Sequence, residues 1–309
     1  MAAMIELKTH CIEGNSNGLH LVITAGVHGD EFEGIAAIHR LIKKIDTQNL
    51  AGRITLVPVV NESAYELRGR CGKDGLDLAR TCPGRADGSQ TEQVAFALSE
   101  LINSSDLYID LHAGGVIMDV YPLVGYGLVA SKEVLDQQRR MAGAFGLPLV
   151  WGTNPDLDGR SMSVARDAGV PAIYIEYRGN GHCDPQGVEA LYEGCRRVLA
   201  EFAMINDDTT SCVAPVIYED PRPSSGHMQV CYPAPLTGLF EPAVRLGERV
   251  EVGEPIGWVS DSFSGQRTEI PATDAGAVIV LRTYPRVDQG DALAVVLEGA
   301  EQLPKCQGE

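Results

Sequence analysis

Two side chains that bind metal ions well, His28 and Glu31, stand three residues apart in the stretch from Ile23 to Gly34. An apolar run ends at Gly26 and a helical pattern begins at Phe32, so both side chains lie where a strand passes into a helix. Imidazole nitrogen and carboxylate oxygen suit Zn²⁺, which in catalytic sites takes three protein ligands and a water molecule. Acidic residues also favour the first turn of any helix, because they complement its dipole. An ordinary helix start therefore remains the alternative for this pair.

A third candidate ligand, His112, follows the apolar run 107–111 and precedes two glycines. Asp110 lies on the same face of this predicted strand, where its carboxylate could accept the N–H of a ligating histidine. The alternative is a histidine of an ordinary turn. We predict one zinc ion per chain, bound through His28, Glu31 and His112.

A further carboxylate, Glu176, ends the apolar run 170–175 and precedes a glycine-rich turn. Burying a carboxylate is costly without a partner, and burial raises its pKa toward the range that a general acid or base needs. The alternative is a strand-end ion pair with Arg178. In the turn itself, Arg178, Asn180 and His182 are candidates for substrate recognition, or else ordinary turn residues.

The elements that must position these side chains alternate between strands and helices, which predicts an α/β fold with a mixed sheet flanked by helices. Apolar runs predict strands over residues 21–23, 53–60, 107–111, 147–151 and 170–175, and helical periodicity predicts helices over 32–45, 91–103, 161–167 and 188–205. Residues 62–85 contain several glycines and a proline without a clean period, which predicts a long and functional loop.

A polar break at residues 206–210 predicts a domain boundary, with a catalytic domain over 1–206 and a β domain over 207–309. Beyond it, short β-branched runs are separated by glycine and proline, which is typical of a small all-β module. These runs cover residues 213–217, 228–231, 243–246, 256–259, 277–281 and 293–297.

The composition narrows the classes of partner. A formal charge of −17 over 309 residues argues against binding to nucleic acid or an anionic membrane surface. No leading charged-then-apolar signal and no apolar run of ~20 residues is present, so we expect no membrane association and a cytoplasmic protein. The eight cysteines form no C-x-x-C pair, which favours reduced thiols over a disulfide framework.

In chain order, His28, Glu31, His112 and Glu176 resemble the site of the succinylglutamate desuccinylase and aspartoacylase family, the zinc carboxypeptidase-like aminoacylases. The resemblance spans about residues 19–176. It implies a zinc carboxypeptidase-like fold, a zinc ion held by the first three residues, and Glu176 as the catalytic base.

The same resemblance extends to Asn61 after the second strand, to Arg70 in the following loop, and to the segment 77–80, where the family has Asp-Leu-Asn-Arg. It implies that Asn61 and Arg80 bind the substrate and that Arg80 does so by pairing with the carboxylate of the substrate. It also implies that Arg70 stabilises the developing oxyanion. Ala79 stands where the family has asparagine. We therefore expect looser recognition, with a simple acyl group on a less acidic amino compound.

The tail resembles a biotinyl or lipoyl carrier module of the barrel-sandwich type, around residues 268–278. Such carriers need a lysine at the hairpin tip, and residues 262–267 contain none, so we expect no covalently attached cofactor. The module more plausibly forms the rim of the cleft or a contact in a homo-oligomer.

Together these features predict a zinc-dependent amidohydrolase that removes the acyl group from an N-acylated amino acid or a related small amine. A metallocarboxypeptidase shares the chemistry and differs in its leaving group. A binding protein with a degraded site is the non-enzymatic alternative: Ala79 favours it, whereas the intact set of four residues opposes it.

Overall fold

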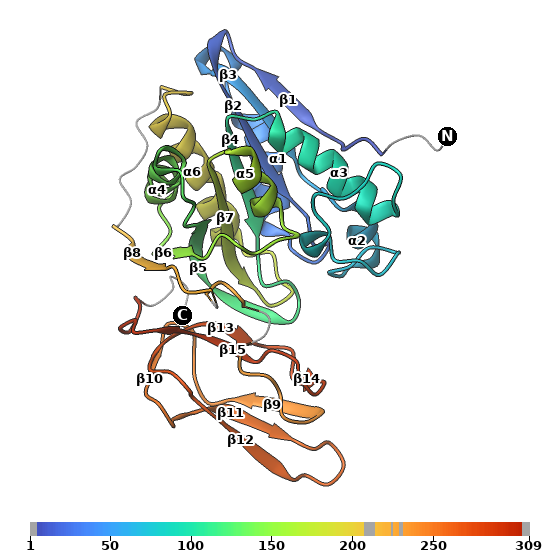
Figure 1. Ribbon diagram of the computed structural model, residues 1–309, viewed down its shortest axis with the longest axis vertical. Coiled ribbons are helices and arrows are strands. Elements are labelled where there is room, and N and C mark those ends of the chain that lie inside the picture. The colour runs from blue at the N-terminus through green and yellow to red at the C-terminus, as the bar shows by residue number, and fades with distance from the viewer. Residues whose placement is uncertain (1–4, 207–213, 224, 229–230, 305–309) are drawn as a thin grey trace.

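The computed structural model describes residues 5–206, 214–223, 225–228 and 231–304. The described helices all lie in one part of the molecule, around a twisted sheet. The C-terminal strands gather at one end of it (Figure 1).

The main sheet is mixed, as predicted. Its strands in the first part of the chain are β1 (His10–Glu13), β2 (Ser16–Ala25), β3 (Ala51–Val57), β4 (Leu107–His112), β5 (Met118–Gly127), β6 (Leu149–Thr153), β7 (Ala172–Gly179) and β8 (Val216–Asp220). They follow the order β1-β3-β2-β4-β7-β5, with β6 beside β5 and β8 beside β6. Strands β3, β2, β4 and β7 run parallel, β1 is antiparallel to β3, and β5 is antiparallel to β7 but parallel to β6.

Helices cover both faces of this sheet. They are α1 (Glu33–Lys44), α2 (Glu62–Leu67), α3 (Gln90–Asn103), α4 (Lys132–Phe145), α5 (Ser161–Ala168) and α6 (Pro185–Glu201), with short 3₁₀ turns η1 (Thr47–Asn49) and η2 (Leu78–Arg80). Because side chains alternate along a strand, Leu21 and Ile23 of β2 join the core under α1, α4 and α6, whereas Val22 joins the core under α3 and α5.

Several sequence predictions need correction. Residues 62–85 are not one loop, because Asn61 caps the short helix α2 and Asp77 caps η2. The sequence does not predict strand β5, because this strand contains Pro122 and glycines, which disfavour strands. Its pairing with β7 is irregular, since the register shifts between Val120 and Leu123. Helix α4 was not predicted either, because its buried side is narrow and its composition polar.

The C-terminal all-β region has two sheets. Its strands are β9 (Gly238–Pro242), β10 (Arg249–Val250), β11 (Pro255–Ser260), β12 (Arg267–Pro271), β13 (Gly276–Arg282), β14 (Arg286–Val287) and β15 (Ala294–Glu298). A separate antiparallel sheet has the order β12-β11-β9-β14, which confirms the predicted β region. Strand β13 pairs instead with β5 and so extends the main sheet.

The proposed boundary at residues 206 and 207 stays a prediction, because residues 207–213 lie outside the described part of the chain. Two expected β runs, 213–217 and 228–231, include residues outside it as well. Strand β8, expected in the C-terminal module, pairs in parallel with β6. Within the described residues, every helix is too short or too polar to span a lipid bilayer.

One apolar cluster joins the two parts of the chain: Leu123 and Trp151 of the main sheet pack with Ile279 and Leu297 of the C-terminal region. A chain that ends at Asn206 should therefore unfold at a lower temperature and self-associate, because it exposes this apolar surface. Calorimetry and light scattering on the fragment and the full chain check this expectation. A monomeric fragment with the unfolding temperature of the full chain would contradict it.

Candidate active site

The loop between β2 and α1 holds His28 and Glu31 in a buried position, with exposed fractions of 3% and 5%. Gly29 lies between them against the backbone of α2. A Cβ atom built at Gly29 would stand 2.1 Å from the carbonyl carbon of Ala64, so only glycine allows this close approach. The sequence thus places both side chains where the parallel strands end.

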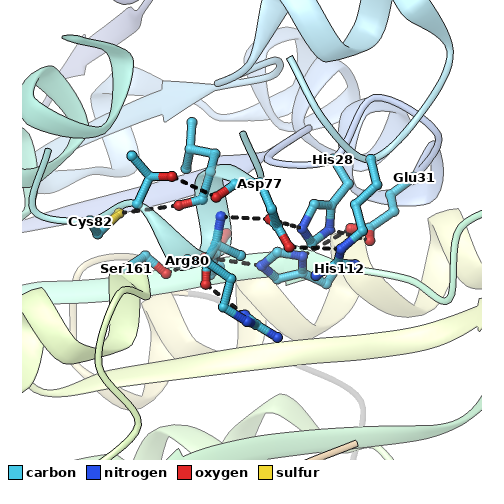
Figure 2. Close-up of polar contacts among 12 residues, drawn as sticks. His28, Glu31, Asp77, Arg80, Cys82, His112 and Ser161 are labelled. Carbon is cyan, nitrogen blue, oxygen red and sulfur yellow. Dashed lines mark hydrogen bonds and ion pairs between the residues drawn. The ribbon is translucent and has the colours of Figure 1, made fainter. Parts of the chain in front are cut away.

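The Glu31 carboxylate bridges two imidazoles (Figure 2). Its Oε1 lies 2.6 Å from Nδ1 of His28, and its Oε2 lies 2.9 Å from Nδ1 of His112. His112 comes from the end of β4. The three side chains each offer one ligand atom within 4.8 Å of the others, so the structure brings the three predicted ligands together.

The outer nitrogen of each histidine meets a second carboxylate. Nε2 of His28 lies 3.2 Å from Asp77 Oδ1, and Nε2 of His112 lies 3.1 Å from Asp110 Oδ2. Asp110 also accepts hydrogen bonds from the hydroxyls of Thr24, at 2.8 Å, and Ser161, at 2.5 Å. A carboxylate behind each histidine is the usual arrangement around a ligated metal, and two imidazoles with one carboxylate fit Zn²⁺.

Charge pairing moves the pKa of each group in this cluster. Burial lowers the pKa of His112, but Asp110 and Glu31 outweigh burial and hold that pKa well above its usual value. Burial also lowers the pKa of His28, but the charge of Glu31 outweighs burial, so the pKa of His28 is raised. Burial raises the pKa of Glu31, yet the two neighbouring histidines bring it below its usual range. The carboxylate therefore stays ionised between the imidazoles.

Glu176 lies beside this cluster. In the parallel pair of β4 and β7, Glu176 is the register partner of His112. Its Oε2 atom is buried and has no hydrogen-bond partner among the described residues. Burial, the largest cause, raises the pKa of Glu176 to about 8. Arg178, which the alternative interpretation paired with Glu176, contacts Asp119 of β5 at 3.0 Å.

A cavity of about 790 Å³ opens in front of these residues, and both parts of the chain contribute to its wall. The first part supplies Arg70, Ala79 and Arg80 from the segment between α2 and α3. The C-terminal region supplies Arg282 and Asp291, which pair at 2.9 Å.

Several arginines line this cavity. Nε of Arg70 lies 2.9 Å from Oδ2 of Asp77, so this carboxylate links Arg70 to His28. Burial and the nearby Arg160 lower the pKa of Arg80 to about 10. The sequence prediction missed Arg160, which also lines the cavity and forms no ion pair among the described residues. Its only sequence signal is its place just before the start of α5.

The other predicted substrate-binding residues do not line the cavity. The side chain of Asn61 is buried and accepts the N–H of Ala64 at 3.1 Å, which caps α2. Arg178 turns toward Asp119, and Asn180 and His182 are exposed in the turn after β7. A substrate-binding role for these four residues stays a prediction without support from this geometry.

Comparison with known proteins places the chain among related sequences. Residues 17–202 match the succinylglutamate desuccinylase/aspartoacylase catalytic domain. The N-alpha-acetyl-L-2,4-diaminobutyric acid deacetylase of Halomonas elongata is 31% identical over 293 residues, which cover 91% of this chain and 83% of that protein.

Solved structures resemble the whole fold. The product-bound ectoine utilization protein EutE (DoeB) of Ruegeria pomeroyi matches with a TM-score of 0.86 and 27% identity, over 93% of this chain and 87% of that chain. A succinylglutamate desuccinylase from Silicibacter sp. TM1040 matches with a TM-score of 0.85 and 25% identity, over the same shares of the two chains.

Replacing Asp110 tests how the site is built. Asp110→Asn should weaken the affinity for Zn²⁺ by about 10–100-fold, because a neutral amide accepts the N–H of His112 less strongly and makes its other nitrogen a weaker ligand. Competition with a chelating dye measures this. Asp106→Asn is the matched control, since Asp106 accepts the backbone N–H of His20 away from the site. Equal zinc affinities of the Asp110 variant and the unaltered protein would refute the role of Asp110.

Proposed function

Because the chain belongs to the succinylglutamate desuccinylase/aspartoacylase family, we propose that it is a zinc-dependent hydrolase cleaving the amide bond of N-acyl amino acids or related N-acylated small amines. One observation carries this proposal: the buried, unpartnered oxygen of Glu176 lies next to His112 in the β4–β7 register. A carboxylate left without a hydrogen bond beside a metal-ligand set is suited to take a proton from a substrate water.

One zinc ion per chain would be held by His28, Glu31 and His112. Asp77 and Asp110 contact the outer nitrogens of the two histidines. The chemistry that zinc supplies when bound is acidification of a water molecule and polarisation of the amide carbonyl. The carboxylates behind the histidines would hold both imidazoles in their present orientation, with Nδ1 directed to Glu31.

Glu176 would accept the proton of the attacking water and return it to the departing nitrogen. Its pKa, raised to about 8 by burial, suits both steps near neutral pH. Arg70, fixed by Asp77, would stabilise the negative charge that develops on the amide oxygen. Arg80 and Arg160 would hold the carboxylate of the substrate through charge-assisted hydrogen bonds.

The shape of the cavity favours a small substrate over a peptide. Its volume of about 790 Å³ falls in the range of small-molecule sites, and Arg282 and Asp291 of the C-terminal region form part of its wall. A metallocarboxypeptidase would need room for a peptide chain there. The complete set of catalytic side chains argues against a non-catalytic binding protein.

The amine of the substrate should be less acidic than glutamate or aspartate. Ala79 lines the cavity where the family has asparagine, so one polar contact to an acid group is absent. The related protein from Halomonas elongata is named as a deacetylase of an acetylated diamino acid, whose side chain is basic. We infer an N-acetylated neutral or basic amino acid as substrate.

Three further features remain predictions from the sequence: a cytoplasmic location, a homo-oligomeric state, and a barrel-sandwich form of the C-terminal region. The two sheets of that region enclose their own apolar cluster, with Phe240, Val259 and Val278 among its members, as a sandwich requires.

Replacing the proposed base tests the mechanism. Glu176→Gln should retain zinc but lose about 10²–10⁴-fold in kcat, because an amide of the same shape cannot transfer the proton. Elemental analysis measures the zinc content, and steady-state kinetics measure kcat. Glu33→Gln is the matched control: Glu33 also carries a buried oxygen without a partner, but it does not line the cavity. Near-normal turnover of the Glu176 variant would mean that the base lies elsewhere.

A substrate series tests the proposed specificity. Wild-type protein should cleave N-acetyl derivatives of neutral and basic amino acids with higher kcat/KM than N-succinyl or acidic ones. Ala79→Asn should raise relative activity toward acidic substrates, because it restores a polar contact. If the wild type already prefers doubly acidic substrates and Ala79→Asn changes nothing, the argument from Ala79 fails.

A further inference from the structure

Tyr174 has an unusual position beside Glu176. The two residues are separated by one position on β7, so their side chains share a face of the sheet, and both line the cavity. On the neighbouring strand β5, Gly125 is the register partner of Tyr174. A Cβ atom built at Gly125 would lie 2.0 Å from Cζ and 2.4 Å from the hydroxyl oxygen of Tyr174. The absence of a side chain at Gly125 is what lets the phenol lie there.

The hydroxyl of Tyr174 differs from those of neighbouring buried tyrosines. The Tyr108 hydroxyl pairs with Thr24 at 2.7 Å, and the Tyr126 hydroxyl donates to Glu219 at 2.6 Å. In the described part of the chain, the Tyr174 hydroxyl has no hydrogen-bond partner. Burial, and then the charge of Glu176, raise the pKa of Tyr174, so its phenol remains a hydrogen-bond donor at neutral pH. Tyr174 is only partly buried and lines the cavity, so its hydroxyl is open to a ligand that can accept its hydrogen bond.

Arg160 lines the cavity close enough to Tyr174 for the two groups to affect each other's pKa, and it forms no ion pair among the described residues. Burial lowers the pKa of Arg160, and Tyr174 and Arg70 are among the groups that act on its charge. Arg80 lines the same wall, and its own pKa is lowered partly by Arg160. This wall therefore places the guanidinium of Arg160 near the O–H donor of Tyr174, and a carboxylate group can pair with both.

We propose that the Tyr174 hydroxyl donates a hydrogen bond to the carboxylate of the substrate, beside Arg160, and that Gly125 is required to give the phenol that position. Tyr174 is thus a specificity residue on β7, two positions from the proposed base. The proposal rests on the proposed function, because it needs a substrate that carries a carboxylate. It assigns Tyr174 a role in binding and none in proton transfer.

Tyr174→Phe tests the proposal, since it removes one oxygen and keeps the ring that packs over Gly125. For N-acetyl-L-2,4-diaminobutyrate, KM should rise by about 10–100-fold with kcat changed less than about threefold, as expected for a lost hydrogen bond to a charged group. The inhibition constant of the product amino acid should rise by the same factor. Inhibition by 1,3-diaminopropane, which lacks only the carboxylate, should be unaltered.

Tyr126→Phe is the matched control, because it makes the same change in a buried tyrosine whose hydroxyl donates to Glu219. It should leave both constants near wild type. An unchanged KM in Tyr174→Phe, or a fall in kcat alone, would overturn the role of Tyr174 while leaving the proposed function intact. A wild-type, zinc-loaded protein that cleaves no N-acyl amino acid would instead overturn the proposed function, and this inference with it.

Discussion

A buried carboxylate must be compensated, and the structure around Glu31 follows from this constraint. An isolated charge in a protein interior costs several kcal/mol, so Glu31 is stable there only between His28 and His112. The two imidazoles in turn need Asp77 and Asp110 on their outer sides. The buried carboxylate of Asp110 is in turn stabilised by neutral groups, because the hydroxyls of Thr24 and Ser161 donate hydrogen bonds to it. A divalent cation held by the same three side chains would contribute to this balance.

The sheet supplies the positions for this network. Strands β2, β4 and β7 are parallel neighbours, so their carboxyl ends meet at one edge, where open α/β sheets commonly bind ligands. The alternation of side chains sends Asp110, His112, Tyr174 and Glu176 to the face under α5, and the apolar residues between them to the opposite core. The C-terminal region completes the cavity, because β13 pairs with β5 and brings Arg282 to its wall.

Much of this arrangement could be predicted from the sequence, because local patterns determine it. The apolar runs that end in His112 and Glu176 predict strands β4 and β7, and the glycines around His28 predict the loop between β2 and α1. Contacts between residues far apart in the sequence could not be predicted. Arg160 has no local pattern that marks it. The cap that Asn61 forms on α2 and the ion pair of Arg178 with Asp119 depend on the folded chain, and the place of Tyr174 depends on Gly125 across the sheet. Strand β5 is held by its neighbours against its own composition.

The central claim is that His28, Glu31 and His112 form one zinc centre. X-ray absorption at the zinc edge, on protein purified with its metal, tests this directly. The account predicts about one zinc per chain with only nitrogen and oxygen neighbours at ~2.0–2.2 Å, including two imidazoles. A sulfur neighbour at ~2.3 Å, or a single imidazole, would contradict it, because the ligands would then come from cysteines or from elsewhere in the chain.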